Sequence, residues 1–550
     1  MKTTVRSTLL LLSPVLCLML TACDPGEPAP LSADLSSGQS SLALTQTEFA
    51  ALPAEDQYRV TNKLLGTFYR GVAADEFFDL RRGDTDNLSV IDADVFDDVR
   101  IALNTQLSIQ VKQAIDTEID GIDDEGNPDP DVAKYRFDRE RPRQIPLARI
   151  KEYPISRDLF VNWMAYFLTN TIMFSPATEM ESSFTIDAQR VFRFLVARID
   201  AGDTIRSIIR SNLGSLHRWR VSRSAENHAL EAYELYLGLF DTEEDSYRGG
   251  IACKDYYLTD ESDDYLIDVT DFPNTEPQLI LNDYFVTSCE DLYDVIAGHP
   301  AVIPRVTEVI ANYLFSGRTQ EERRSIINQV VAANPETFED IFKIMLFSRE
   351  YLLDTERPMS FEENMLGLLD RLHWTSESNS GAIGRSIFVN MANPASNSQI
   401  AMRPMGWDSM SLKIGRLPDV PLDALSFANY HKAMRESVLR NINAYTGVGS
   451  RPAGLIYDDS GDVKPAIRAM TTEGFIDFLF LTSVMRKPTD DERSALVDII
   501  VVDKNYTNTD PVSGLEVIRD NLFDNTATLV FDYISRLPEF YYFKRVGGNS

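Results

Sequence analysis

The chain has 550 residues, which at about 150 residues per domain allows about two to four domains. Its 44% hydrophobic and 25% charged residues are typical of a globular protein and exclude an intrinsically disordered chain. Asp and Glu number 84 against 53 Lys and Arg, which gives a formal net charge of −31. A surface this acidic repels phosphate backbones and argues against nucleic acid as a partner.

Residues 1–22 predict a lipoprotein signal peptide. Lys2 and Arg6 form a basic start, and the apolar run Leu9–Leu20 is too short to span a bilayer as a mature helix. The following Leu20-Thr21-Ala22-Cys23 resembles the bacterial lipobox, in which the Cys is lipidated and becomes the new N-terminus. We therefore expect Cys23 to carry acyl chains such as palmitate. The alternative is an ordinary secretory signal with an incidental Cys.

Residues 23–45 are rich in Pro, Ser and small side chains, a composition that predicts a flexible tether behind the lipidated Cys23. Asp24 resembles a signal that retains lipoproteins in the inner membrane of enteric bacteria, a rule that other Gram-negative groups do not all follow. We expect a soluble body anchored by lipid to the bacterial cell envelope. The choice between the periplasmic side of the inner or outer membrane and the cell surface stays open.

A loop beyond the tether is rich in acidic residues and suggests a calcium site. Asp116, Glu118 and Asp120 alternate before a Gly, and Asp123 and Asp124 follow. Ca²⁺ prefers six to eight oxygen ligands, and such a pattern supplies several carboxylates. The spacing departs from the EF-hand and is slightly more similar to aspartate-rich repeats of the thrombospondin type. A solvated acidic loop is the alternative, and 458–462 is a second, weaker candidate.

Most of the body predicts helices, because apolar residues recur at intervals of three and four. This spacing covers 161–174, 186–199, 226–240, 303–315, 338–346 and 475–485. Capping boxes predict helix starts at Thr319, Ser360 and Thr489. Strand-like alternation is scarce, and 278–286 is the best candidate for a strand.

We therefore expect a mainly α fold, a large multi-helix globular body with few or no strands. The body extends over 46–374 and contains an acidic insertion at 241–290. Residues 375–550 are expected to form an irregular segment and C-terminal helices packed on the same core.

Three candidate catalytic carboxylates and one asparagine lie on one predicted helix. Asn227, Glu231 and Glu234 share a face, and Glu226 precedes them. One hypothesis is a carboxylate site that binds metal or performs acid–base chemistry. The other is a polar latch, in which Arg218, Arg220 or Arg223 pairs with the glutamates and orients two helices.

The acidic insertion contains both cysteines that remain after Cys17 leaves with the leader and Cys23 receives lipid. An exported protein meets an oxidising compartment, so Cys253 and Cys289 predict a disulfide. Two free thiols or a metal pair are the alternatives. His299 precedes a Pro and predicts the start of a helix rather than a metal ligand.

The glutamate helix also carries a resemblance to a known family. Glu226–Leu235 resembles the E-N-x-A-x-E-x-x-E-L segment of the bacterial exported family called domain of unknown function 1800. His299-Pro300, Ile341–Tyr351, Gly406-Trp407 and Leu537–Phe540 are similar to later landmarks of that family. Where its members carry an H-D-x-G-x-K-like piece, this chain carries the acidic insertion. The resemblance implies a helical exported protein and leaves the activity undefined.

The sequence lacks a P-loop, a G-x-S-x-G elbow and an H-E-x-x-H motif. We therefore expect a cell-envelope lipoprotein that is a scaffold or binding module rather than an enzyme. Its partner would be an envelope protein or a polysaccharide, and calcium is the one cofactor that the sequence suggests. The alternative is a metal-assisted or carboxylate-based hydrolase that acts on an envelope or extracellular polymer.

Overall fold

The computed structural model describes residues 42–77, 95–120, 144–173, 185–261, 264–373, 415, 455–458 and 460–547. The predicted leader, Cys23 and nearly all of the tether lie outside the described residues. The same holds for Asp123, Asp124 and most of the predicted irregular segment after residue 374.

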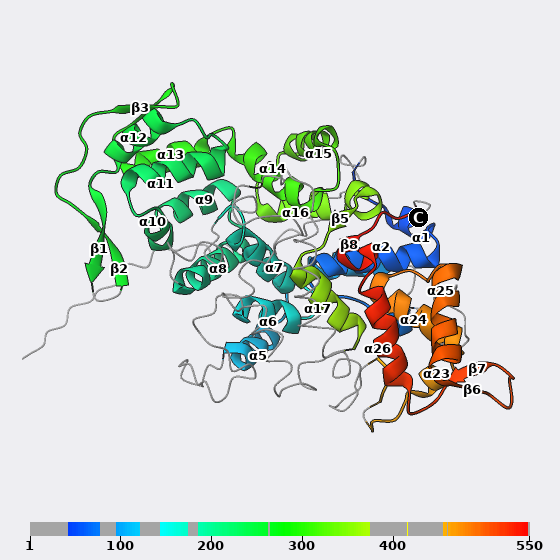
Figure 1. The fold of residues 1–550 in the computed structure, drawn as a ribbon. Helices are drawn as coiled ribbons and strands as arrows, with labels where there is room; N and C mark the ends of the chain where they lie inside the picture. The colour runs from blue at the N-terminus through cyan, green and yellow to red at the C-terminus, as the bar shows by residue number, and fades with distance from the viewer. Residues whose placement is uncertain are drawn as a thin grey trace, which may run out of the picture.

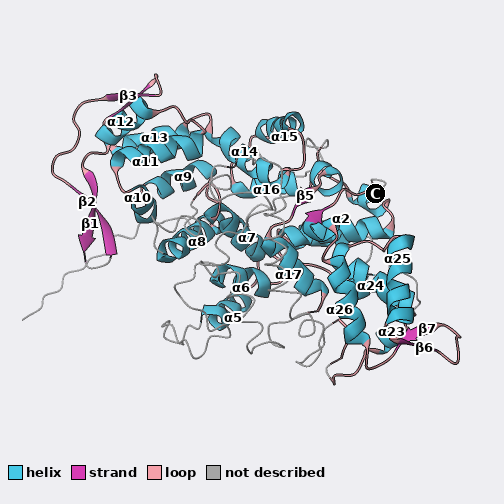
Figure 2. Cartoon of the chain, in the orientation of Figure 1, coloured by secondary structure: helices cyan, strands magenta, loops and turns pink. Residues whose placement is uncertain are grey.

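The described residues are mainly helical, as predicted (Figures 1 and 2). The first helices are α1 (Gln46–Ala50), α2 (Ala54–Thr67), α3 (Ala74–Phe77), α4 (Val95–Ala102), α5 (Ile109–Asp120), α6 (Gln144–Glu152) and α7 (Arg157–Thr169). Next come α8 (Thr185–Asp200), α9 (Ile205–Leu213), α10 (Leu216–Ser222), α11 (Ala225–Ala232), α12 (Glu243–Ala252) and α13 (Cys289–Gly298). They are followed by α14 (Val302–Leu314), α15 (Gln320–Ala332), α16 (Phe338–Leu346) and α17 (Phe361–Arg371). The C-terminal helices are α23 (Pro465–Arg468), α24 (Thr472–Val484), α25 (Asp490–Val497) and α26 (Phe523–Ile534).

Shorter elements join these helices. Among the described residues, three segments are π-helical, namely η2 (Tyr233–Leu237), η3 (Glu350–Asp354) and η5 (Asp498–Asp503), and η6 (Pro538–Tyr541) is a 3-10 turn. The strands form antiparallel pairs: β1 (Tyr256–Glu261) with β2 (Asp264–Val269), β3 (Gln278–Ile280) with β4 (Tyr284–Val286), β5 (Arg357–Pro358) with β8 (Tyr542–Phe543), and β6 (Thr507–Thr509) with β7 (Glu516–Ile518).

The three predicted helix starts are confirmed, because each has a capping box in the structure. The hydroxyls of Thr319, Ser360 and Thr489 each accept a hydrogen bond from a backbone N–H three residues later, and the Glu at that position bonds back to the cap. Each box satisfies two backbone donors that the helix itself leaves without a partner. Local sequence therefore determines where α15, α17 and α25 begin.

Two predicted elements differ from the structure. The helix expected over 226–240 is α-helical only to Ala232, continues as η2 and ends at Gly238 with φ +72°. The single strand expected over 278–286 is wrong, because the chain reverses and forms the β3–β4 hairpin. Leu281 and Asn282 have φ of +49° and +64° at this turn, and Asn tolerates the left-handed conformation better than most residues do.

The N-terminal and C-terminal helices share one continuous hydrophobic core, to which Phe49 and Phe531 both contribute. Strand β5 lies beside β8, with Arg357 opposite Phe543, so the middle of the chain is joined to its end. In Figure 1, α9–α13 lie at one end of the molecule and α23–α26 at the other, with α2, α7 and α17 between them.

The acidic insertion is a structured part of the fold. It contains α12, the two hairpins β1–β2 and β3–β4, and the start of α13. The sulfurs of Cys253 and Cys289 lie 2.04 Å apart, so the predicted disulfide is present and joins the end of α12 to the start of α13.

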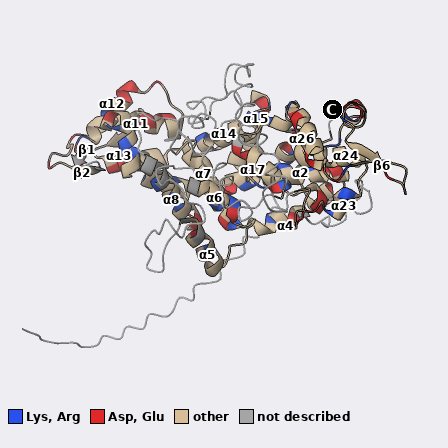
Figure 3. Cartoon of the chain, turned by 60° about the horizontal axis from the view of Figure 1, so that its bottom comes forward, with Lys and Arg blue, Asp and Glu red and all other residues tan. Residues whose placement is uncertain are grey.

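Charged residues of both signs are distributed over the helices (Figure 3). Within the described ranges, none of the helices combines the length and apolar composition needed to cross a bilayer.

Candidate functional site: a latched glutamate helix and an arginine-lined pocket

The glutamate helix α11 packs closely against α12. A Cβ added to Gly249 would lie 2.8 Å from Cβ of Ala229, and one added to Gly250 would lie 2.9 Å from Cα of Glu226. Real Cβ atoms do not approach this closely, so the two glycines allow the helices to touch. The spacing of Glu226 and Ala229 is therefore explained by helix packing.

The carboxylate of Glu231 is held by two partners. Arg218 on α10 is completely buried, and its Nη2 forms an ion pair with Oε2 of Glu231. Asn227 Nδ2 donates to Oε1 of Glu231 over 3.1 Å and to the carbonyl of Ser222 over 3.0 Å. Since charge-assisted hydrogen bonds are among the stronger ones, this arrangement fixes α10 against α11. It is the polar latch, formed by Arg218.

Two of the four predicted residues, Asn227 and Glu231, are in direct contact. Glu226 is exposed in the first turn of α11, and Glu234 is half-buried in η2. The ring of the neighbouring His228 stacks on Trp219 with 4.4 Å between centroids. Burial lowers the pKa of His228 well below its ordinary value, so this imidazole is neutral at physiological pH.

The predicted calcium residues begin in a helix rather than in a tight loop. Helix α5 extends to Asp120 and includes Asp116 and Glu118. The Asp116 carboxylate accepts the Tyr153 hydroxyl over 2.5 Å and lies 3.4 Å from Nε of Arg149. Asp116 thus has partners within the fold. The rest of the motif, and the side chains of Glu118 and Asp120, lie outside the described residues, so calcium binding stays a prediction.

The second acidic loop, 458–462, uses its carboxylate to form a turn. Asp458 Oδ1 accepts the backbone N–H groups of Ser460 (2.9 Å) and Asp462 (3.1 Å), and Gly461 has φ +84°. Such Asx turns mimic a backbone turn. Among the residues that the structure describes, no three His, Cys, Asp or Glu side chains are grouped to hold a metal ion.

His299 helps to begin α14, as predicted. Its Nδ1 accepts the backbone N–H of Ala301 over 3.2 Å, one residue before the helix starts. Burial and the nearby Arg206 lower the pKa of His299.

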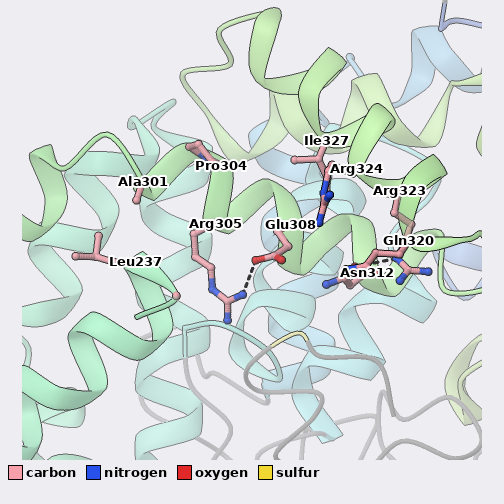
Figure 4. A pocket seen from close by; sticks show the side chains of 11 residues that line it. Leu237, Ala301, Pro304, Arg305, Glu308, Asn312, Gln320, Arg323, Arg324 and Ile327 are labelled. Carbon is pink, nitrogen blue, oxygen red and sulfur yellow. Dashed lines mark hydrogen bonds and ion pairs between the residues drawn. The ribbon is translucent and has the colours of Figure 1, made fainter. Parts of the chain in front are cut away.

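A pocket of about 500 Å³ lies where η2 meets α14 and α15 (Figure 4). Its lining is rich in guanidinium groups and amides. The residues are Leu237, Gly238, Ala301, Pro304, Arg305, Glu308, Asn312, Gln320, Arg323, Arg324 and Ile327.

Arg305 forms one wall of the pocket and is 7% exposed. Its Nη1 donates to Oε2 of Glu308 over 2.7 Å, and its Nε donates to the carbonyl of Leu235 over 3.3 Å. That carbonyl belongs to η2, where helix geometry leaves oxygens without partners and favours a cation. A Cβ at Gly238 would lie 3.0 Å from Cδ of Arg305, so the absence of a side chain at Gly238 allows this approach.

Arg323 and Arg324 form the opposite wall, on α15. Arg323 donates from Nε to Oδ1 of Asn312 over 3.1 Å and from Nη1 to the carbonyl of Arg318. Its partial burial lowers its pKa without removing its charge. In Figure 4, Arg324 extends from α15 toward α14. Within the described part of the chain, no carboxylate forms an ion pair with either side chain.

The sequence pattern does not indicate this pocket. Arg305, Glu308 and Asn312 share a face of α14 at intervals of three and four, which was the only local signal. The pocket itself depends on Leu237, the last residue of η2, and on Gly238 after it, which are about 70 residues away from that face.

No protein-family model matches the chain, and none of the curated proteins or solved structures is similar to it. Function must therefore be inferred from the chain's own residues.

Proposed function

We propose that this chain is a lipid-anchored protein of the bacterial cell envelope whose helical body is a non-enzymatic binding module or scaffold. Its partner would be a polymer or a protein of the envelope. The ion pair between Arg218 and Glu231 is the single observation that favours binding over catalysis.

A catalytic carboxylate must be able to exchange a proton with substrate or coordinate a metal. Both oxygens of Glu231 are instead occupied, one by the buried Arg218 and the other by Asn227. Displacing them would leave the Arg218 charge buried without its partner, which is costly. The arrangement therefore supports a structural role for Glu231.

The proposed anchor is Cys23. The lipobox-like Leu20–Cys23 motivates this part of the proposal, and the Pro-rich residues after it would separate the body from the membrane. Several acyl chains, at about 0.8 kcal/mol per buried CH₂, would hold the protein firmly. Kinship with the family called domain of unknown function 1800 is a hypothesis that depends on the residues quoted for it.

The experiment uses the mature chain in detergent and envelope fragments that contain peptidoglycan and surface polysaccharide. We expect the protein to sediment with the fragments without releasing soluble reducing ends or peptides. A protein that remains in the supernatant contradicts the binding role.

Hydrolysis would show the rival function. If soluble products appear and a Glu231→Gln variant that is still folded no longer releases them, the chain is a carboxylate-based hydrolase. A Glu226→Gln variant is the matched control, because Glu226 lies on the same helix but is exposed.

A further inference from the structure

We propose that the pocket between η2, α14 and α15 binds an acidic sugar, with the sugar carboxylate on Arg323 and Arg324 and sugar hydroxyls on Glu308 and Gln320 (Figure 4). This inference deepens the proposed binding function, on which it rests, by naming the class of ligand.

The α15 wall of the pocket is positively charged. The chain carries 84 acidic and 53 basic residues, so carboxylates are abundant. Arg486 and Arg493, for example, each pair with an acid of their own surroundings. Arg323 and Arg324 have no such partner among the described residues, although Arg323 is half-buried. A guanidinium presents two parallel donors whose geometry matches a carboxylate.

Glu308 is a carboxylate whose charge is already compensated. This residue is 47% exposed and lines the pocket, but Arg305 already neutralises its charge through the 2.7 Å contact. A compensated carboxylate attracts a ligand ammonium group only weakly, yet it can still accept a hydrogen bond from a hydroxyl. The pocket therefore favours a ligand that combines a carboxylate with hydroxyls over a zwitterionic one.

The size of the pocket and its apolar lining also bear on the class of ligand. A pocket of about 500 Å³ is large enough for a small organic ligand rather than for an inorganic anion alone. Part of the lining is apolar carbon surface that the ring of a sugar can cover. This surface is supplied by Leu237, Ala301, Pro304 and Ile327.

The net charge of the chain limits the length of the ligand. A net charge of −31 repels a long polyanion over the rest of the surface, although salt screens this repulsion beyond about 8 Å at physiological ionic strength. The pocket is therefore suited to a short acidic oligosaccharide or to the end of an acidic chain.

The test is calorimetric titration of the mature chain in detergent with trigalacturonate, with neutral maltotriose and inorganic phosphate as comparison ligands. We expect trigalacturonate to bind most tightly. Arg324→Ala removes an exposed side chain and should weaken the binding by about tenfold or more, because a charge-assisted pair is lost. Arg323→Lys keeps the charge but loses the guanidinium fork, and should also weaken it. Arg193→Ala, at an exposed Arg of α8, should change nothing.

Three results would overturn the inference. Trigalacturonate could bind no better than maltotriose, phosphate could bind as tightly as trigalacturonate, or Arg324→Ala could behave as Arg193→Ala does. Sedimentation of the wild-type chain with envelope fragments shows whether the proposed binding function fails as well or only the acidic-sugar inference. If sedimentation persists while trigalacturonate does not bind, the protein is a binding module and the pocket is not its acidic-sugar site.

Discussion

Arg357 and Glu363 form a completely buried, two-pronged ion pair in the middle of the molecule. Nη1 of Arg357 lies 2.9 Å from Oε2 of Glu363, and Nη2 lies 2.6 Å from Oε1. The Tyr351 hydroxyl accepts from the same Nη2 over 2.9 Å. Because Arg357 is in β5, which pairs with β8, this ion pair lies where the N-terminal and C-terminal parts share their core.

Glu363→Gln should destabilise the protein by about 3–5 kcal/mol, because it leaves a buried guanidinium without its counter-charge. Denaturant unfolding followed by circular dichroism measures this loss. Glu473→Gln is the control, since Glu473 is exposed in the first turn of α24 and should change stability by less than about 1 kcal/mol. Equal effects of the two substitutions would contradict the account of the core.

Acid should destabilise the protein through His217. This imidazole is buried, and its Nε2 lies 2.7 Å from Oδ1 of Asn212. Burial, together with the nearby positive charge of Arg218, lowers the pKa of His217 to about 3. The native state therefore keeps the ring neutral while an unfolded chain, with a pKa of about 6.5, takes up a proton.

The unfolded state thus binds more protons than the native state between about pH 6.5 and pH 3, and the free energy of unfolding falls as pH decreases through that range. At pH 4.5 the expected loss is about 2.5 kcal/mol relative to pH 7, because the loss accumulates at about 1.4 kcal/mol per pH unit below about pH 6.5. In a His217→Gln variant the decrease between these two pH values should be smaller by this amount. An unchanged decrease would show that His217 is not the group responsible.

The Cys253–Cys289 disulfide should contribute about 4 kcal/mol to stability, because it closes a loop between residues 36 positions apart. A Cys253→Ala/Cys289→Ala double variant should melt at a lower temperature than the oxidised wild type, and reduction of the wild type should reproduce the shift. Reductant should leave the double variant unchanged. A wild-type melting temperature that reductant does not alter would contradict this contribution.

Local signals were sufficient for much of the fold. The capping box at Thr319 and the apolar spacing over 338–346 predict α15 and α16, because both depend on neighbours a few residues away. The sequence pattern does not predict the η2 segment or the β3–β4 hairpin. Each depends on a residue in the left-handed conformation, Gly238 after η2 and Asn282 in the hairpin turn, which interrupts an otherwise regular pattern of apolar residues.

For the candidate site, too, the sequence predicts contacts between consecutive elements but not contacts between distant ones. The sequence placed Arg218 close enough to Glu231 to suggest the latch, because α10 and α11 are consecutive. It could not predict the pocket, where Arg305 reaches the Leu235 carbonyl from a position 70 residues further along the chain. Contacts at that separation are created by tertiary packing and leave no periodic pattern in the sequence.

The central claim is that acyl chains on Cys23 hold this helical body at a bacterial envelope. Intact-mass measurement of the protein extracted from the membranes of an expressing bacterium tests it most directly. The account predicts a chain that begins at residue 23 and exceeds the mass of its amino acids by that of the attached lipid. An unmodified Cys23, with the protein recovered in the soluble fraction, would contradict the claim.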